Sequence, residues 1–164
     1  MATPSEKDMF QTTYTREHET TLKVLRAFPA DKGTYTSHPK NNTATQIGWT
    51  FAVENNVMIM ALKGPLELKG FPPAPDKFAD VVAAYEKSTK DFMAVLAKTP
   101  EKRMNETVKF FSGPKQMADY RVIDFLWFML MDSIHHRGQL STYIRPAGGK
   151  VPSIYGPSGD EPWM

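Results

Sequence analysis

Hydrophobic residues recur three and four positions apart along four stretches of the chain, which is the pattern of amphipathic helices. The predicted helices cover residues 7–28, 43–63, 76–98 and 117–145. Thr43 is a candidate N-cap for the second helix, and Pro29 and the Gly64-Pro65 pair mark the ends of the first two. The fourth helix, with Gly138 as its one internal breaker, would be about 40 Å long at about 1.5 Å per residue.

Two connecting segments lack a helical pattern. The prolines of PLELKGFPPAP, residues 65–75, exclude regular structure. Residues 99–116 hold a capped turn, TPEKRMN, and ETVKFF, which could form a short extended piece; we predict that this segment is irregular. Because alternation with a period of two is almost absent, the sequence predicts an all-α four-helix bundle, built by a single domain over residues 1–164. The long connections leave both a simple antiparallel and an up-down-down-up arrangement open.

Composition narrows the classes of function. A chain of 164 residues has the size of one domain, and 41% hydrophobic and 23% charged residues are typical of a soluble globular protein. The formal net charge of +2 is small and the basic residues are scattered, so nothing favours binding to nucleic acid. The N-terminus lacks the pattern of a secretory signal, and the longest apolar run, Phe125–Met131, is far shorter than the roughly 20 residues of a membrane span. We therefore expect a cytoplasmic protein without membrane partners.

The chain has no cysteine. This excludes disulfides, thiolate metal ligands and a nucleophilic thiol of the protein's own. Any thiol chemistry must use the thiol of another molecule.

Two polar residues interrupt the apolar face of the fourth helix. The face consists of residues that share one side at helical spacing: Val122, Phe125, Met129, Asp132, His136, Leu140 and Tyr143. A buried carboxylate without a partner costs roughly several kcal/mol, so Asp132 requires compensation. The candidates are His136 as an imidazolium, Arg137, or a bound metal ion.

The second helix carries a matching irregularity, because Glu54 lies on its apolar stripe and Thr50 sits one turn before it. If the two helices face each other, Glu54, Asp132 and His136 converge, and Thr50 adds a hydroxyl at the rim. Two carboxylates and an imidazole suit a divalent ion such as Zn, Ni, Fe or Mn. The alternative is a hydrogen-bonded polar pair of Asp132 and His136 with a purely structural role.

Three further residues are candidates for the same pocket. His135 is turned by about 100° from its neighbour and faces another helix or solvent. Arg137 could bind a substrate anion or lie on a solvated face. His18 lies near the apolar face of the first helix and could enter the same cavity.

The fourth helix is apolar on most of its circumference, which requires cover on all sides. A second subunit packed helix to helix would supply it, and so would the aromatic C-terminal tail. The sequence leaves a homodimer and a tail-covered monomer equally open.

Three motifs resemble those of the DinB/YfiT family, named for damage-inducible bacterial proteins. They are HHRGQLSTYIR at residues 135–145, GGKVPSIYGPS at residues 148–158 and ATQIGWTFAVE at residues 44–54. The resemblance implies an up-down-down-up four-helix bundle, often dimeric. It also implies a divalent metal held by three histidines, and thiol-dependent transferases and isomerases among the relatives.

The resemblance transfers one of the three metal ligands. The second histidine of the family's H-x-x-x-H pair falls on His136, whereas the first falls on Asp132 and the histidine of the second helix falls on or near Thr50. Glu54, one turn along, could replace the missing ligand.

These observations lead to two expectations of function. The first is a metal-dependent enzyme, a thiol-dependent transferase or related enzyme acting on a small-molecule substrate, with a low-molecular-weight thiol as a further cofactor. The alternative is a metal-free small-molecule-binding or stress-response bundle without catalysis. Metal content separates the two.

Overall fold

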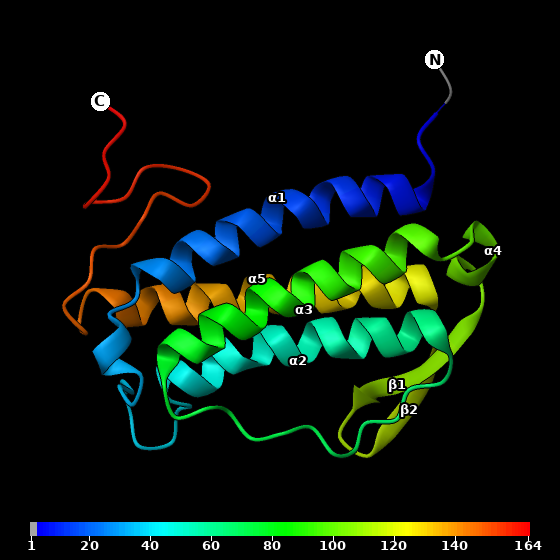
Figure 1. Cartoon of the computed structure of the whole chain (residues 1–164), viewed down its shortest axis with the longest axis horizontal. Coiled ribbons are helices and arrows are strands. Elements are labelled where there is room, and N and C mark those ends of the chain that lie inside the picture. The colour runs from blue at the N-terminus through cyan, green and yellow to red at the C-terminus, as the bar shows by residue number, and fades with distance from the viewer. Residues whose placement is uncertain (1–2) are drawn as a thin grey trace.

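The computed structural model describes residues 3–164 and is mostly helical (Figure 1). Four long helices account for most of it: α1 (Glu6–Ala27), α2 (Ala44–Lys63), α3 (Phe78–Lys98) and α5 (Val122–Ile144). A 3-10 turn, η1 (Ala30–Lys32), and a one-turn helix, α4 (Glu101–Met104), lie in the connections. In Figure 1, α1 and α5 run from right to left, whereas α2 and α3 run from left to right.

Side-chain caps fix the starts of α1 and α2. Ser5 accepts a hydrogen bond from the Asp8 amide, and the Asp8 side chain accepts one from the Ser5 amide. Thr43 and Gln46 exchange the same pair of bonds at the start of α2, so the predicted cap is confirmed. Each pair satisfies two amides that a helix start would otherwise leave free.

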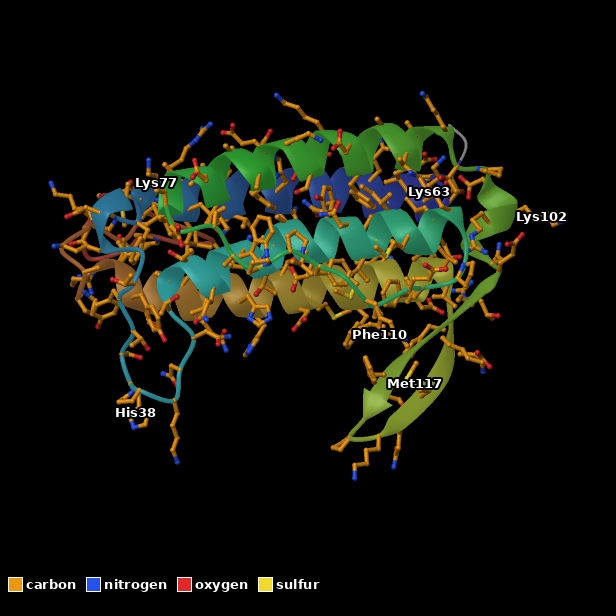
Figure 2. All side chains as sticks on the ribbon, turned by 60° about the horizontal axis from the view of Figure 1, so that its bottom comes forward. His38, Lys63, Lys77, Lys102, Phe110 and Met117 are labelled. Atoms are coloured by element: carbon orange, nitrogen blue, oxygen red, sulfur yellow. The ribbon has the colours of Figure 1, made fainter. Side chains whose placement is uncertain are left out.

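The predictions of an irregular segment over residues 99–116 and of a helix from residue 117 are wrong, and the chain is mostly helical rather than all-α; the extended piece considered for ETVKFF is present. Beyond α4, two antiparallel strands form a hairpin, β1 (Thr107–Gly113) and β2 (Gln116–Arg121), and α5 begins at Val122 rather than near Met117. Figure 2 shows this hairpin, labelled at Phe110 and Met117, extending away from the helices. Its inner face packs on α5, where the ring of Phe110 lies 4.9 Å from that of Phe125 and 5.9 Å from that of Phe128. The strands therefore owe their stability to contacts with the helix that follows them, since an isolated hairpin is at best marginally stable.

The core divides into two hydrophobic clusters, one toward each end of the helices. One is built around Phe10, Phe92 and Phe125, and the other around Phe51 and Phe78. At the second cluster Gly48 lets α2 approach α3, because a Cβ there would lie 2.9 Å from Cγ1 of Val81.

Polar residues separate the two clusters along α1, α2 and α3. The Tyr14 hydroxyl donates to Oδ1 of Asn55 at 2.6 Å, and the Asn55 amide donates to Ser88 and Thr89 at 3.0 Å. This buried layer is fully hydrogen-bonded, so it fixes how the helices align rather than leaving a reactive group.

The segment after α5 returns over α1 and α5 (Figure 1). Glu161 pairs with Lys23 of α1 at 2.8 Å, and Asp160 pairs with Arg145 at 2.8 Å. In the described part of the chain, no helix has the length and apolarity that crossing a membrane requires.

Candidate functional site

Helices α2 and α5 bring Glu54, Asp132 and His136 together. Their ligand-type atoms all lie within 4.8 Å of one another. Nε2 of His136 is 3.8 Å from Oε1 of Glu54 and 3.7 Å from Oδ2 of Asp132. Asp132 and His136 are one turn apart on α5, and Glu54 reaches them from the antiparallel helix. We call these three residues the triad.

Glu54 is the buried member of the triad, with 2% of its surface exposed. Its Oε2 accepts a hydrogen bond from the Ser133 hydroxyl, whereas its Oε1 has no hydrogen-bond partner within residues 3–164. Burial raises the pKa of Glu54 well above its usual value and the nearby Asp132 carboxylate raises it further, while Ser133 opposes the shift. An unpartnered buried carboxylate oxygen is costly, so this atom requires a proton or a cation.

The hydrogen bonds of His136 determine which ring nitrogen faces the carboxylates. Its Nδ1 lies 2.9 Å from the amide oxygen of Gln139, and the amide nitrogen of Gln139 lies 3.0 Å from Nε2 of His135. An amide oxygen only accepts, so Nδ1 of His136 donates to Gln139, and Nε2 is the ring nitrogen that faces the two carboxylates. Metal-binding histidines are commonly held in this way by a partner on the other nitrogen.

Ser133 was not selected from the sequence, and Gln139 was considered only as a residue that could bind a substrate anion or lie on a solvated face. The first hydrogen-bonds Glu54 and the second orients His136. Gln139 is three positions after His136, a spacing that places two side chains on one side of a helix. Nothing in the sequence distinguishes Ser133 from an ordinary helical serine.

The predicted pocket residues Thr50, His135 and His18 lie outside the triad. The Thr50 hydroxyl donates to the carbonyl of Gln46 in its own helix at 3.1 Å. His135 is exposed and contacts Gln139. The expected entry of His18 into the cavity is wrong, because its Nδ1 lies 3.1 Å from Oγ1 of Thr89, on the α1–α3 side. Burial lowers the pKa of this imidazole.

Arg137 does not lie on a solvated face, one of the two positions that the sequence suggested, and its charge is already paired within the protein. It is 1% exposed, and its Nη2 pairs with Oε2 of Glu17 at 2.9 Å. The Tyr155 hydroxyl donates to the same Glu17 oxygen at 2.5 Å, and the guanidinium lies 5.0 Å from the Tyr155 ring centre. The ion pair thus joins α1, α5 and the C-terminal segment, and it plays a structural part.

The donors of the triad fit a divalent ion. Two carboxylates and an imidazole nitrogen suit borderline or hard cations better than soft ones. Such an ion would neutralise two converging negative charges and satisfy Oε1 of Glu54.

Comparison with known proteins agrees with this fold. The chain is 24% identical over 159 residues to YrdA of Bacillus subtilis strain 168, a match that covers 94% of this chain and 90% of YrdA, whose description is "uncharacterized protein". A DinB-like protein of Bacillus cereus ATCC 10987 superposes with a TM-score of 0.74 at 23% identity, over 89% of this chain and 95% of that one. The DinB-like protein YjoA of Bacillus subtilis superposes with a TM-score of 0.72 at 13% identity, over 95% and 99% of the two chains.

A protein-family model also matches nearly the whole chain. The model described as "DinB family" covers residues 4–163, including both helices that supply the triad. The chain belongs to the DinB family.

Proposed function

We propose that this protein is a metal-dependent enzyme, a transferase or a related enzyme acting on a small molecule, with a divalent ion held by Glu54, Asp132 and His136. The observation that supports it is the buried Oε1 of Glu54, which has no hydrogen-bond partner in residues 3–164 and points to the same space as Nε2 of His136. Buried polar atoms in a packed core normally have a hydrogen-bond partner, so an atom without one favours a ligand site.

The surrounding residues prepare the three donors. Ser133 holds one oxygen of Glu54, which leaves the other free to bind, and Gln139 keeps the proton of His136 on Nδ1. Asp132 is the most accessible donor, since 40% of its side chain is exposed, so the substrate would approach from its side. A bound ion would supply a Lewis acid and could hold the sulfur of a thiol cofactor as thiolate. The chain has no cysteine, so that thiol would be a separate low-molecular-weight molecule.

A metal-free binding protein is the second candidate. The raised pKa of Glu54 favours it, because a proton on this carboxyl removes the buried charge without any cation. In that case the triad is a polar wall of a ligand pocket and supplies no catalysis.

Elemental analysis separates the two candidates. Protein purified without a histidine tag or chelator is compared with Asp132→Ala and His136→Ala. We expect about one equivalent of a transition metal in the wild type and loss of most of it in both variants, because each removes one of three protein ligands. His38→Ala and Asp91→Ala are matched controls, since both residues are exposed and neither belongs to the triad, and they should keep the metal.

The outcome that contradicts the proposal is equally definite. A wild type that binds no metal after supplementation with Zn, Ni, Fe and Mn salts assigns the triad to a metal-free pocket. Metal that both triad variants retain shows that the ion binds elsewhere.

Two further parts of the family pattern complete the proposal. We infer that the long helices form an up-down-down-up four-helix bundle, which is supported by the helix directions in Figure 1. We also infer a homodimer built on α5, because Phe128 and Met131 are 41% and 61% exposed although the hairpin and the C-terminal segment cover other parts of the helices. Exposed large apolar side chains that cluster on one helix favour a protein partner.

A further inference from the structure

A polar pocket lies beside the triad, between the C-terminal half of α5 and the loop that leads into α2. Its volume is about 370 Å³, within the range of small-molecule sites. Figure 2 shows the loop, with His38 labelled, extending away from the helices. The side chains that line this loop pocket are mostly polar and include Ser37, Lys40, Asn41, Asn42, Thr142 and Tyr143.

The lining of the loop pocket favours a negatively charged ligand. It offers hydroxyls, carboxamides and one ammonium, and no carboxylate within the described residues lines it. Lys40 forms no ion pair with any residue of the described chain, so its charge is available to a ligand.

The pKa of the Tyr143 hydroxyl also depends on the polar residues of the loop. Burial raises its pKa, but hydrogen-bonding interactions with Ser37, Thr36 and Asn41 outweigh burial, and the pKa is lowered. The Tyr143 hydroxyl itself donates to the carbonyl of Asn42 at 3.2 Å, which ties the loop to α5 at the wall of the pocket.

The loop holds its shape through its own hydrogen bonds. The Thr36 hydroxyl donates to the carbonyl of His38 at 2.8 Å, and the Asn41 amide donates to the Ser37 hydroxyl at 3.0 Å. The Tyr35 ring packs edge-on against that of Tyr143, with 5.3 Å between centres. A pocket that is already formed needs little ordering when a ligand binds.

Gln139 connects the loop pocket to the triad. Its side chain lines the pocket and also hydrogen-bonds His136. On the opposite wall, Ile47 lines the pocket seven positions before Glu54 on α2. At 1.5 Å per residue the two places are about 10 Å apart along the helices, a span that one small molecule can bridge.

We propose that the loop pocket binds the anionic, hydroxyl-rich end of a small polyhydroxy acid whose other end lies at the triad. Lys40 contacts the carboxylate or phosphate, and the hydroxyls and carboxamides of the pocket bind the hydroxyl groups. The placement of the reacting end rests on the proposed function, whereas binding of the anionic end does not require a metal.

The test uses D-gluconate as the probe on the full-length, chelator-treated protein. Two analogues separate the features of the ligand: glucitol keeps the hydroxyls without the charge, and hexanoate keeps the charge without the hydroxyls. Binding is followed by NMR, through the side-chain amide signals of Asn41, Asn42 and Gln139. We expect gluconate to shift these signals at millimolar concentration and both analogues to bind at least about tenfold more weakly, because each lacks one set of contacts.

Variants locate the site. Lys40→Gln should weaken gluconate binding about tenfold or more, because it removes the charge that the carboxylate contacts. Lys90→Gln on α3 is the matched control, since it removes an equally exposed lysine far from the pocket, and it should leave the affinity unchanged. Thr142→Val should weaken binding without changing the charge.

Three results would overturn the proposal: no shift at these amides, equal binding of glucitol or hexanoate, or equal binding by Lys40→Gln. A metal titration of the same protein tests the triad separately. Gluconate binding without metal binding would reject the proposed function and keep the loop pocket, and the reverse result would reject the loop pocket alone.

Discussion

Glu17 and Arg137 form a buried ion pair. Both side chains are almost fully buried, at 4% and 2% exposed, and their charged groups lie 2.9 Å apart. The Tyr155 hydroxyl and the carbonyl of Glu17 satisfy further polar atoms of the pair. Two charges removed from water are tolerated only when each has its partner, so the loss of one is expensive.

Arg137→Met should therefore destabilise the protein strongly. It leaves the Glu17 carboxylate buried without its counter-charge, and we expect the free energy of unfolding to fall by about 3 to 5 kcal/mol in urea denaturation. Arg26→Met is the matched control, because the Arg26–Glu86 pair is largely exposed, and it should cost no more than about 1 kcal/mol. Equal small losses in both variants would show that the buried pair contributes no more than a surface pair.

The same pair predicts a pH dependence of stability. Burial raises the pKa of Glu17, but the hydrogen bonds from Tyr155 and Arg137 and the charge of Arg137 outweigh burial, and the pKa lies below the usual 4.5. The folded state thus binds the proton more weakly than the unfolded state. The stabilisation is complete above about pH 4.5 and is lost as the pH falls through the lowered pKa.

Urea denaturation between pH 3 and pH 6 measures this effect. In Glu17→Gln the loss of stability below pH 4.5 should be smaller than in the wild type, because the titrating group is absent. A wild-type stability that stays constant, or rises, on acidification below pH 4.5 would contradict the assignment. Glu86→Gln, in an exposed pair, should follow the wild-type profile.

At the scale of elements, two glycines inside helices differ in how closely other residues pack against them. A Cβ at Gly48 would lie 2.9 Å from Val81 and 3.3 Å from Leu25, whereas nothing lies within 4 Å of a Cβ at Gly138. Both residues are inside helices, where alanine is intrinsically better than glycine by about 1 kcal/mol.

The pair of substitutions Gly48→Ala and Gly138→Ala therefore isolates the effect of packing. We expect Gly138→Ala to stabilise the protein by about 0.5 to 1 kcal/mol, and Gly48→Ala to destabilise it by about 1 to 2 kcal/mol, because overpacking outweighs the helix preference. Chemical denaturation of the three proteins measures both changes. Stabilisation by both substitutions would show that α2 and α3 can separate at no cost.

The elements also show how far the sequence alone leads. The four long helices follow from the spacing of apolar residues, and the caps at Thr43 and Ser5 agree with local rules for helix starts. The hairpin was missed because no glycine or proline separates β2 from α5, so QMADYR reads as the start of the helix. Its boundary is set by Phe110 and Tyr120 packing on Phe128, which are tertiary contacts that the spacing of apolar residues does not reveal.

The candidate site, too, was only partly predictable from the sequence. Asp132 and His136 stand out because they interrupt an apolar face, and Glu54 because it does so on a helix of matching pattern. Arg137 was misplaced because its partner Glu17 lies on α1, far away in the chain, and sequence periodicity carries no information on such pairs.

At the scale of the whole molecule, the exposed part of α5 is the basis of the inferred homodimer. Phe110 and Tyr120 of the hairpin pack on Phe128 but leave 41% of it exposed, and Met131 one turn on is 61% exposed. The C-terminal segment lies against α1 and the other end of α5, so it does not cover these two residues.

Light scattering during size exclusion tests the inferred homodimer. We expect a mass about twice that of the 18.5 kDa chain for the wild type and one chain mass for Met131→Glu, because a buried charge opposes an apolar interface. Met9→Glu changes another exposed methionine, on α1, and should remain dimeric. A wild type that is monomeric at every concentration would rule the dimer out.

The triad has a consequence that reaches beyond chemistry. Its members come from helices that meet only in the native chain, and Ser133 and Glu54, which hydrogen-bond across the same contact, are 79 positions apart. A molecule that bridges α2 and α5 therefore binds the native state and has almost no affinity for the unfolded chain. At a hundredfold excess over its dissociation constant it would add about 2.7 kcal/mol to the stability. Thermal denaturation in the presence of metal salts and candidate acids thus ranks ligands before any reaction is known, and the melting temperature of the protein becomes the assay for its own substrate.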